Sequence, residues 1–235
     1  QRQMCIRDRF EKEFGIKSAE SFQSIIEDEN IDAVYIPLPP ALHFPYAKAA
    51  LEHGKHVFVE KPSTISYEQT SELVELARKK NLVLQENYMF QFHSQLNEIE
   101  NFIASGELGK LRLVRTSFGF PRRAEGDFRY VKELGGGTMM DNGGYTIKLI
   151  DMLLGESMRL VSSQLDYDEK TGIDIFGTAE FVNDDGVIAQ AAFGMDCQYQ
   201  CSLELWGSRG RLTTGRIYTA PDGFKPVALL SLIHI

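Results

Sequence analysis

The chain has 235 residues, of which 43% are hydrophobic and 25% are charged, and its formal net charge is -8 at pH 7. This balance predicts a soluble globular protein with room for one large or two modest domains. Nucleic acids and anionic membranes are bound through clustered cations, and the sequence has no Lys/Arg block, so we expect neither as a partner. No apolar run approaches the ~20 residues that cross a bilayer, and no signal-peptide pattern opens the chain, so we expect a cytoplasmic protein that acts on a small molecule.

The two ends of the chain do not fit the segments beside them. Residues 1–9 (QRQMCIRDR) and 230–235 (LSLIHI) resemble translated sequencing-adapter sequence. We therefore expect both segments to be non-native, with a natural protein that continues beyond them.

Helices and strands alternate up to about residue 88. Gly15 ends the last turns of a helix, Pro37–Pro40 is expected as a rigid turn, and a capping box of Ser66 and Gln69 opens a further helix. The pattern predicts helices at 21–29, 45–53 and 66–80, and strands at 31–36, 57–59 and from 82 onward. Such alternation is typical of a parallel, doubly wound sheet with right-handed crossovers.

After Tyr88 the pattern changes to strands with little helix between them. One helix is predicted at about 92–105, and strands are predicted at 110–120, 160–167, 174–182, 187–195 and 198–206. Residues 183–186 (NDDG) form a hairpin turn. A second α/β domain with a mostly antiparallel open sheet is therefore expected.

Lys61 directly follows a buried-strand pattern. Val57, Phe58 and Val59 form an uninterrupted apolar run, as expected of a parallel strand covered on both faces, and Glu60, Lys61 and Pro62 come next. Ligands sit beyond the carboxyl ends of such strands, so we expect Lys61 to face a crevice. The alternative is a pair of surface charges that lead into a loop.

A second candidate stretch begins at the glycine loop 135–137 and is predicted to continue as a helix to about Leu154. At 3.6 residues per turn, Asp141, Tyr145 and Lys148 share one stripe of that helix, beside an apolar stripe that packs on the sheet. The alternative is a solvated face whose glycines permit close helix packing.

Lys61, Asp141 and Tyr145 together suit the interconversion of a carbonyl and an alcohol. A tyrosine can transfer a proton to or from a sugar oxygen if a nearby cation such as a lysine lowers its pKa. A carboxylate can anchor a hydroxyl, and the hydride must come from a cofactor. The sequence has no Walker loop and no HExxH, CxxC or G-x-S-x-G motif, so we expect neither a metal site nor a nucleophilic serine.

In their order along the chain, these motifs resemble the Gfo/Idh/MocA oxidoreductases over roughly residues 10–228. The resemblance is carried by IPLPP at 36–40 with His43, HVFVEKP at 56–62, IASGELG at 103–109, DFRY at 127–130, GGGTMMDNGGY at 135–145 and LWGSRG at 205–210. It implies a partial dinucleotide-binding Rossmann domain at 10–88 and a substrate-binding and oligomerisation α/β domain at 89–229. The open sheet of the second domain would then form a homo-oligomer.

The same resemblance assigns roles to individual residues. It places Lys61 beside the nicotinamide and the substrate, makes Tyr145 the acid/base, and makes Asp141 a ligand of a substrate hydroxyl, with Lys148 also near the substrate. The Lys61–Pro62 peptide bond is cis in many members. The residues expected to border NAD or NADP are Pro37, Leu38, His43, Glu60, Lys61, Pro62, Asn87 and Arg129.

Three positions bear on the substrate. Tyr145, where many members carry histidine, resembles the glucose-fructose oxidoreductase and nucleotide-sugar 3-ketoreductase branch. Lys148 and Gln91 depart from the histidine and arginine that are frequent there, so the identity of the sugar stays open. The sequence also has no G-x-G-x-x-G turn and no following acidic residue to bind the ribose. Because that turn supplies much of dinucleotide affinity, we expect the fragment alone to bind cofactor poorly and assign the activity to the intact parent.

The leading hypothesis is therefore an NAD(P)-dependent oxidoreductase that acts on a sugar or a nucleotide sugar. Reduction of a 3-keto nucleotide sugar competes with oxidation of a free aldose at C1. A non-catalytic dinucleotide-binding sensor or scaffold is the alternative from a different class, and retention of Lys61, Asp141 and Tyr145 argues against it.

Overall fold

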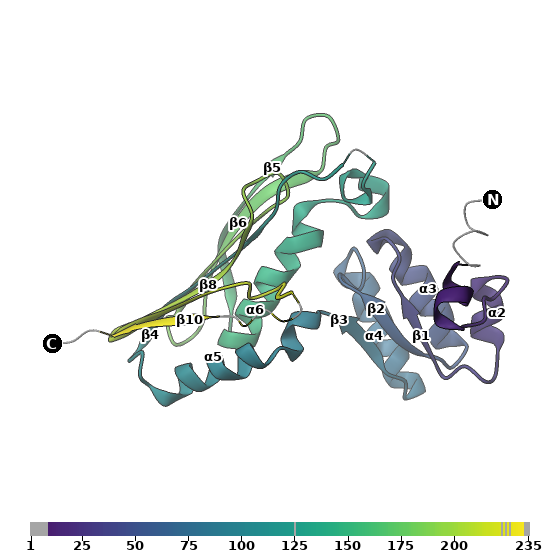
Figure 1. Ribbon diagram of the computed structural model, residues 1–235, viewed down its shortest axis with the longest axis horizontal. Coiled ribbons are helices and arrows are strands. Elements are labelled where there is room, and N and C mark those ends of the chain that lie inside the picture. The colour runs from purple at the N-terminus through teal and green to yellow at the C-terminus, as the bar shows by residue number, and fades with distance from the viewer. Residues whose placement is uncertain (1–8, 125, 222, 224, 226, 233–235) are drawn as a thin grey trace.

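Two sheets organise the chain (Figure 1), and the computed structural model describes residues 9–124, 126–221, 223, 225 and 227–232. A three-stranded parallel sheet with its helices comes first, and a seven-stranded sheet follows. The α/β fold predicted from the sequence is confirmed. Residues 1–8 and 233–235, which belong to the ends predicted to be non-native, lie outside the described residues.

The first sheet has the strand order β1-β2-β3, with β1 at Ala33–Ile36, β2 at His56–Glu60 and β3 at Leu84–Asn87. Its helices are α2 (Phe22–Glu27), α3 (Pro40–Glu52) and α4 (Tyr67–Lys80). Val57 and Val59 of β2 are fully buried with Leu51 of α3 and Leu73 of α4 in one core.

The expectation that β2 is covered on both faces is wrong within the described residues. Side chains alternate between the faces of a strand, and Phe58 points away from Val57 and Val59. Phe58 is 45% exposed, and its register partner Tyr35 on β1 is 57% exposed. The helices α3 and α4 contact each other, and the described residues leave the Tyr35 and Phe58 face open.

Two local predictions in this domain need correction. Helix α3 begins at Pro40 and contains Pro45, although Pro37–Pro40 was predicted to be a turn outside any helix. Proline fits the first helical position because the amide of that residue has no partner in the helix. Only half of the predicted capping box forms, because Ser66 Oγ accepts the Gln69 amide at 3.3 Å whereas the Ser66 amide donates to Thr64 Oγ1 at 3.4 Å.

The second sheet has the order β10-β9-β8-β4-β7-β6-β5, and only the β4–β7 pair is parallel. The strands are β4 (Leu111–Gly119), β5 (Arg159–Tyr167), β6 (Asp174–Val182), β7 (Ile188–Gly194), β8 (Gln200–Gly207), β9 (Gly210–Gly215) and β10 (Ala228–Leu232). Strands β9 and β10 were not predicted, and β10 reaches into the segment 230–235. The predicted homo-oligomer through this sheet stays a prediction.

Helices α5 (Ser94–Ser105) and α6 (Gly144–Leu154) lie on one face of the large sheet, with α6 on the side of the first domain (Figure 1). Leu149 and Ile150 of α6 are fully buried in the main core with Val114 of β4 and Ala189 of β7. None of the helices in the described ranges is both long and apolar enough to span a membrane.

The chain before α6 is not α-helical. Residues Met139–Gly143 form a turn of π-helix, so the predicted stripe of Asp141, Tyr145 and Lys148 at α-helical spacing is wrong. A π turn holds more residues than an α turn, and the residues before it are therefore rotated relative to those in α6. Such turns occur frequently at functional sites.

Glycine is required at the start of α6 by close packing. A Cβ on Gly144 would lie 2.3 Å from the hydroxyl oxygen of Tyr88, which is too close for two non-bonded atoms. The alternative that glycines permit close helix packing therefore holds at Gly144, where α6 packs against the Tyr88 ring.

We expect Gly144→Ala to destabilise the protein because of that clash. Overpacking costs about 1–3 kcal/mol, against a gain of at most ~1 kcal/mol from the better helix propensity of alanine. In a Tyr88→Phe background the obstructing oxygen is gone, so the same substitution should be neutral or stabilising. Urea unfolding of the four proteins in this double-mutant cycle measures the difference.

Gly215→Ala is the control, because nothing lies within 4 Å of a Cβ at that position. Equal costs of Gly144→Ala with and without the Tyr88 hydroxyl would contradict the packing argument.

Candidate active site

The carboxyl end of β2 meets the π turn of the second domain at Lys61. Its ammonium donates hydrogen bonds to Asp141 Oδ1 at 2.7 Å and to the Asp141 backbone carbonyl at 2.8 Å. The side chains of Lys61 and Asp141 are only 14% and 11% exposed. Lys61 therefore faces the interior between the domains, and the alternative of a surface charge is wrong. The Lys61–Pro62 peptide bond is cis, as expected.

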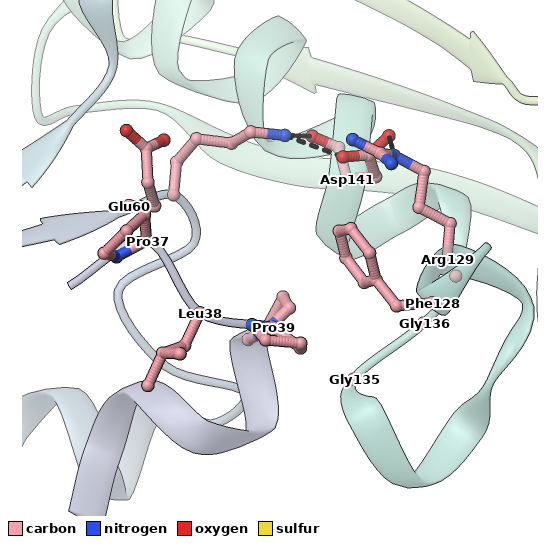
Figure 2. Close-up of a pocket in the computed structure, with 12 residues that line it drawn as sticks. Pro37, Leu38, Pro39, Glu60, Phe128, Arg129, Gly135, Gly136 and Asp141 are labelled. Atoms are coloured by element: carbon pink, nitrogen blue, oxygen red, sulfur yellow. Dashed lines mark hydrogen bonds and ion pairs between the residues drawn. The ribbon is translucent and has the colours of Figure 1, made fainter. Parts of the chain in front are cut away.

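Arg129 completes a three-residue charge cluster with Lys61 and Asp141. Its Nε donates to Asp141 Oδ2 at 2.8 Å (Figure 2). Its Nη1 donates to Asp127 Oδ1 at 3.1 Å. Both carboxylate oxygens of Asp141 are thus engaged by cations. Burial alone would raise the pKa of Asp141, but the charges of Lys61 and Arg129 outweigh it and hold that pKa below its ordinary value.

Buried polar contacts fix the π turn that carries Asp141. Asn142 is fully buried, and its Nδ2 donates to the carbonyl of Phe118 at the end of β4 and to that of Gly194 at the end of β7. Asp174 Oδ2 accepts the Met139 amide at 2.6 Å, and a Cβ on Gly137 would collide with Asp174 Oδ1. The glycine loop and the ends of two strands therefore hold the Asp141 backbone in place.

Tyr145 lies beside this cluster in an aromatic environment. Its ring centroid is 4.8 Å from Lys61 Nζ, and its ring packs against those of Tyr88, Phe118 and Tyr218. Burial and the nearby Asp141 carboxylate raise the pKa of Tyr145 well above its ordinary value. The expectation of a lowered pKa at Tyr145 is therefore wrong, because burial of the phenol outweighs the effect of the nearby cations.

Two cavities share the charge cluster as a common wall. The first, of about 310 Å³, lies at the carboxyl ends of β1 and β2. The second, of about 500 Å³, lies on the side of Tyr145 and the large sheet. Lys61, Arg129 and Asp141 line both. A group bound in the first cavity and a group bound in the second would thus meet at these three side chains.

Five of the residues predicted to border the cofactor line the first cavity, namely Pro37, Leu38, Glu60, Lys61 and Arg129. Figure 2 shows Pro37, Leu38 and Pro39 on one side of it, and Phe128 with the Gly135–Gly136 loop on the other.

The other three, His43, Pro62 and Asn87, do not line this cavity but contact residues beside it. Asn87 Nδ2 donates to Glu60 Oε1 at 2.7 Å. The ring of His43 is fully buried, with Nδ1 2.7 Å from the Pro62 carbonyl and Nε2 2.6 Å from the Leu38 carbonyl.

Lys148 is not brought to the cluster. Its ammonium lies 3.6 Å from Asp151 on a half-exposed side of α6, and it lines neither cavity. Its predicted contact with substrate has no support in this geometry.

Several lining residues of the second cavity were not predicted. They include Arg123, Tyr199 and Arg216, which belong to no motif in the sequence. Arg122 and Arg123 follow the run Phe118–Pro121 at the end of β4, and this pair after an aromatic strand end is the one signal that could have indicated Arg123.

Two family models match the chain. The model described as "Oxidoreductase family, NAD-binding Rossmann fold" matches residues 6–88, and the GFO/IDH/MocA C-terminal domain matches residues 96–213. The chain belongs to the GFO/IDH/MocA oxidoreductase family. The resemblance inferred from the motifs is thus confirmed.

Curated proteins are similar to this chain over most of its length. The chain is 41% identical over 216 residues to dTDP-3,4-didehydro-2,6-dideoxy-alpha-D-glucose 3-reductase of Streptomyces violaceoruber, a match that covers 91% of this chain and 63% of that protein. It is 32% identical to D-xylose 1-dehydrogenase (NADP(+)) 2 of Haloferax volcanii over 94% of this chain and 67% of that enzyme.

Among solved structures, KijD10, a 3-ketoreductase from Actinomadura kijaniata in complex with NADP and TDP-benzene, superposes with a TM-score of 0.93 at 35% identity. The match covers 96% of this chain and 70% of that one. The chain spans just under two thirds of the length of the curated 3-reductases that it matches.

We expect Asp141→Asn to lower the free energy of unfolding by about 3 kcal/mol at neutral pH, because two mostly buried cations lose their anion. The folded-state pKa of Asp141 is depressed, so its contribution is complete above the unfolded pKa of ~3.9 and is lost as the pH falls through the folded value. The difference in unfolding free energy between wild type and variant should therefore stay constant above about pH 4–5 and decrease in acid.

Denaturant unfolding between neutral and acid pH measures this gap. Asp151→Asn is the matched control, because the Lys148–Asp151 pair is exposed and should contribute little. A gap that is absent, or that persists unchanged in acid, would show that the cluster does not act as a buried ion pair.

Proposed function

We propose that the chain forms the catalytic part of an NAD(P)-dependent oxidoreductase that reduces a keto group of a nucleotide sugar. The observation that carries the proposal is the Lys61–Asp141–Arg129 cluster, which forms the common wall of two cavities with Tyr145 at its side. One cavity lies where parallel α/β sheets bind cofactors, at the carboxyl ends of the strands. The other offers room for a second reactant.

The residues of the first cavity fit the nicotinamide end of a dinucleotide. Pro37, Leu38 and Phe128 offer apolar surface to a flat ring, whereas Glu60 and Lys61 offer an acceptor and a donor for the attached carboxamide and ribose. A bound dinucleotide would supply the hydride, which no side chain can provide.

Tyr145 suits the role of proton donor to the carbonyl oxygen as it is reduced. Its raised pKa keeps the phenol protonated at neutral pH, so the proton is available when negative charge develops on the substrate oxygen. Among the described residues no group hydrogen-bonds the Tyr145 hydroxyl, which leaves it free to donate to a ligand. The adjacent Lys61 ammonium would stabilise the resulting phenolate until solvent returns the proton.

Asp141 and Arg129 hold the Lys61 ammonium in place, and Asp141 is also available to a substrate hydroxyl. Asp141 fixes the Lys61 ammonium through two contacts, and Arg129 prevents the carboxylate from turning away. Because Asp141 is held as an anion, it can also accept a hydrogen bond from a substrate hydroxyl next to the reacting carbon. Positioning of this kind contributes to catalysis by reducing the entropy lost on reaction.

The relatives support reduction of a nucleotide sugar. The curated proteins with 34–41% identity are named dTDP-3,4-didehydro-2,6-dideoxy-alpha-D-glucose 3-reductases, and the KijD10 3-ketoreductase was crystallised with NADP and TDP-benzene. Oxidation of a free aldose at C1 is the second candidate, favoured by the similarity to D-xylose 1-dehydrogenase. It would require Tyr145 to act first as a base, which the raised pKa opposes.

We expect Tyr145→Phe to lower kcat by about 10²- to 10⁴-fold, because the proton donor is lost while the ring and its packing remain. The measurement is NAD(P)H consumption with a keto nucleotide sugar and, separately, NAD(P)H formation with a panel of aldoses, on the protein expressed from its whole reading frame.

Tyr167→Phe is the control, since that tyrosine is exposed on β5 and lines neither cavity. If both variants turn over at the wild-type rate, Tyr145 has no part in the chemistry. Turnover of aldoses alone would replace the proposed substrate by the second candidate.

A further inference from the structure

Two arginines line the second cavity together with Lys61, Asp141 and Tyr145. Arg123 follows β4, and Arg216 follows β9. Within the described residues neither is ion-paired with a carboxylate, in contrast to Arg122, which pairs with Asp168 at 3.2 Å, and to Arg129. In a chain with a net charge of -8, two arginines in one cavity that no described carboxylate pairs with are a distinctive local feature.

Arg216 is held in place by its surroundings. Its guanidinium carbon lies 4.6 Å from the centre of the Tyr199 ring, and its Nη1 donates to the Tyr199 hydroxyl at 2.9 Å. The buried Gln95 donates from Nε2 to the carbonyls of Arg216, at 3.4 Å, and of Ile217, at 3.2 Å. Helix α5 thereby anchors the backbone from which the Arg216 side chain extends into the cavity.

The Arg216 backbone is also in an unfavourable conformation. Its φ is +58°, in the left-handed region that residues with a Cβ rarely adopt. The other described non-glycine residue of this kind, Asn81, ends helix α4, where that conformation is common. Arg216 ends no helix, and such strain persists mostly where a site depends on it.

Arg123 is fixed in a comparable way. Its guanidinium carbon lies 4.8 Å from the centre of the Phe120 ring, and its backbone amide donates to the Tyr130 hydroxyl at 2.9 Å. That hydroxyl in turn donates to the Met195 carbonyl at 3.1 Å. Both guanidinium groups are therefore positioned on aromatic rings of the cavity wall, with N–H groups left for a ligand.

We propose that Arg123 and Arg216 form a subsite for the diphosphate of a nucleotide-linked substrate, and that this subsite selects nucleotide sugars over free sugars. Guanidinium groups bind phosphate oxygens through paired N–H donors, and stacking on a ring limits the entropy lost on binding. An uncharged aldose has no group that requires two cations. The inference rests on the proposed function for its substrate, but the binding of a diphosphate can be measured without turnover.

The test uses thymidine diphosphate as the probe and titration calorimetry as the readout, on the protein expressed from its whole reading frame. Arg123→Gln and Arg216→Gln should each weaken thymidine diphosphate binding by about 10- to 100-fold, as expected for lost charge-assisted hydrogen bonds. Arg122→Gln is the matched control, because Arg122 is adjacent in sequence but pairs with Asp168 and does not line the cavity. The Arg122→Gln variant should bind thymidine diphosphate with the affinity of wild type.

Steady-state kinetics provide a second readout. The two cavity variants should raise KM for a keto nucleotide sugar by a similar factor and change kcat little, because the diphosphate lies away from the reacting carbon. Uncharged thymidine should bind wild type and both variants alike. If the strained backbone prevents Arg216→Gln from folding, Arg123→Gln carries the test.

The two proposals fail separately. Wild-type affinity for thymidine diphosphate in both Arg123→Gln and Arg216→Gln would overturn the subsite, even if Tyr145→Phe abolishes turnover. Loss of diphosphate affinity in these variants, in a protein that reduces no nucleotide sugar, would keep the subsite and overturn the proposed function.

Discussion

The contact between Lys61 and Asp141 is the constraint on which the arrangement of the site depends. It joins residues 80 positions apart, one at the end of a strand in the first domain and one in a π turn of the second. Removing a carboxylate and two cations from water is costly unless their geometry is good, and here both carboxylate oxygens and a backbone carbonyl are engaged. This cluster determines where the two domains meet, where the two cavities end and which side of Lys61 faces Tyr145.

The sequence was sufficient to identify the central residues but not their electrostatic relation. Lys61 was predictable because an apolar strand run ends in it, and Asp141 and Tyr145 because they follow a glycine loop. The expected lowering of the Tyr145 pKa failed, since the phenol is buried and the Asp141 carboxylate lies beside it, and both disfavour the phenolate. Sequence spacing does not reveal how deeply the phenol is buried, because the burial comes from rings that are distant in sequence, those of Tyr88, Phe118 and Tyr218.

Other parts of the fold were missed for local reasons. Strand β9 (GRLTTG) is short, begins and ends in glycine and has only one large apolar residue, so its pattern is too weak to predict a strand. The π turn was missed because hydrophobic periodicity assumes 3.6 residues per turn throughout. Arg216 was missed because its importance lies in a left-handed backbone and a stack on Tyr199, and neither leaves a mark in the sequence.

The two arginines and the charge cluster line one cavity but differ in what they can do. Tyr145 is buried, Lys61 and Asp141 are mostly buried, and the three are mutually oriented, which suits the development of charge on a reacting oxygen. Arg123 and Arg216 are exposed to solvent on the wall, which suits the capture of a charged group before reaction. Binding energy gained at a part of the substrate that does not react can be used to orient the part that does. A site of this kind would select its substrate through the diphosphate and react through the sugar, so that enzymes acting on free sugars could keep the Lys61 cluster and differ only at the wall that carries Arg123 and Arg216.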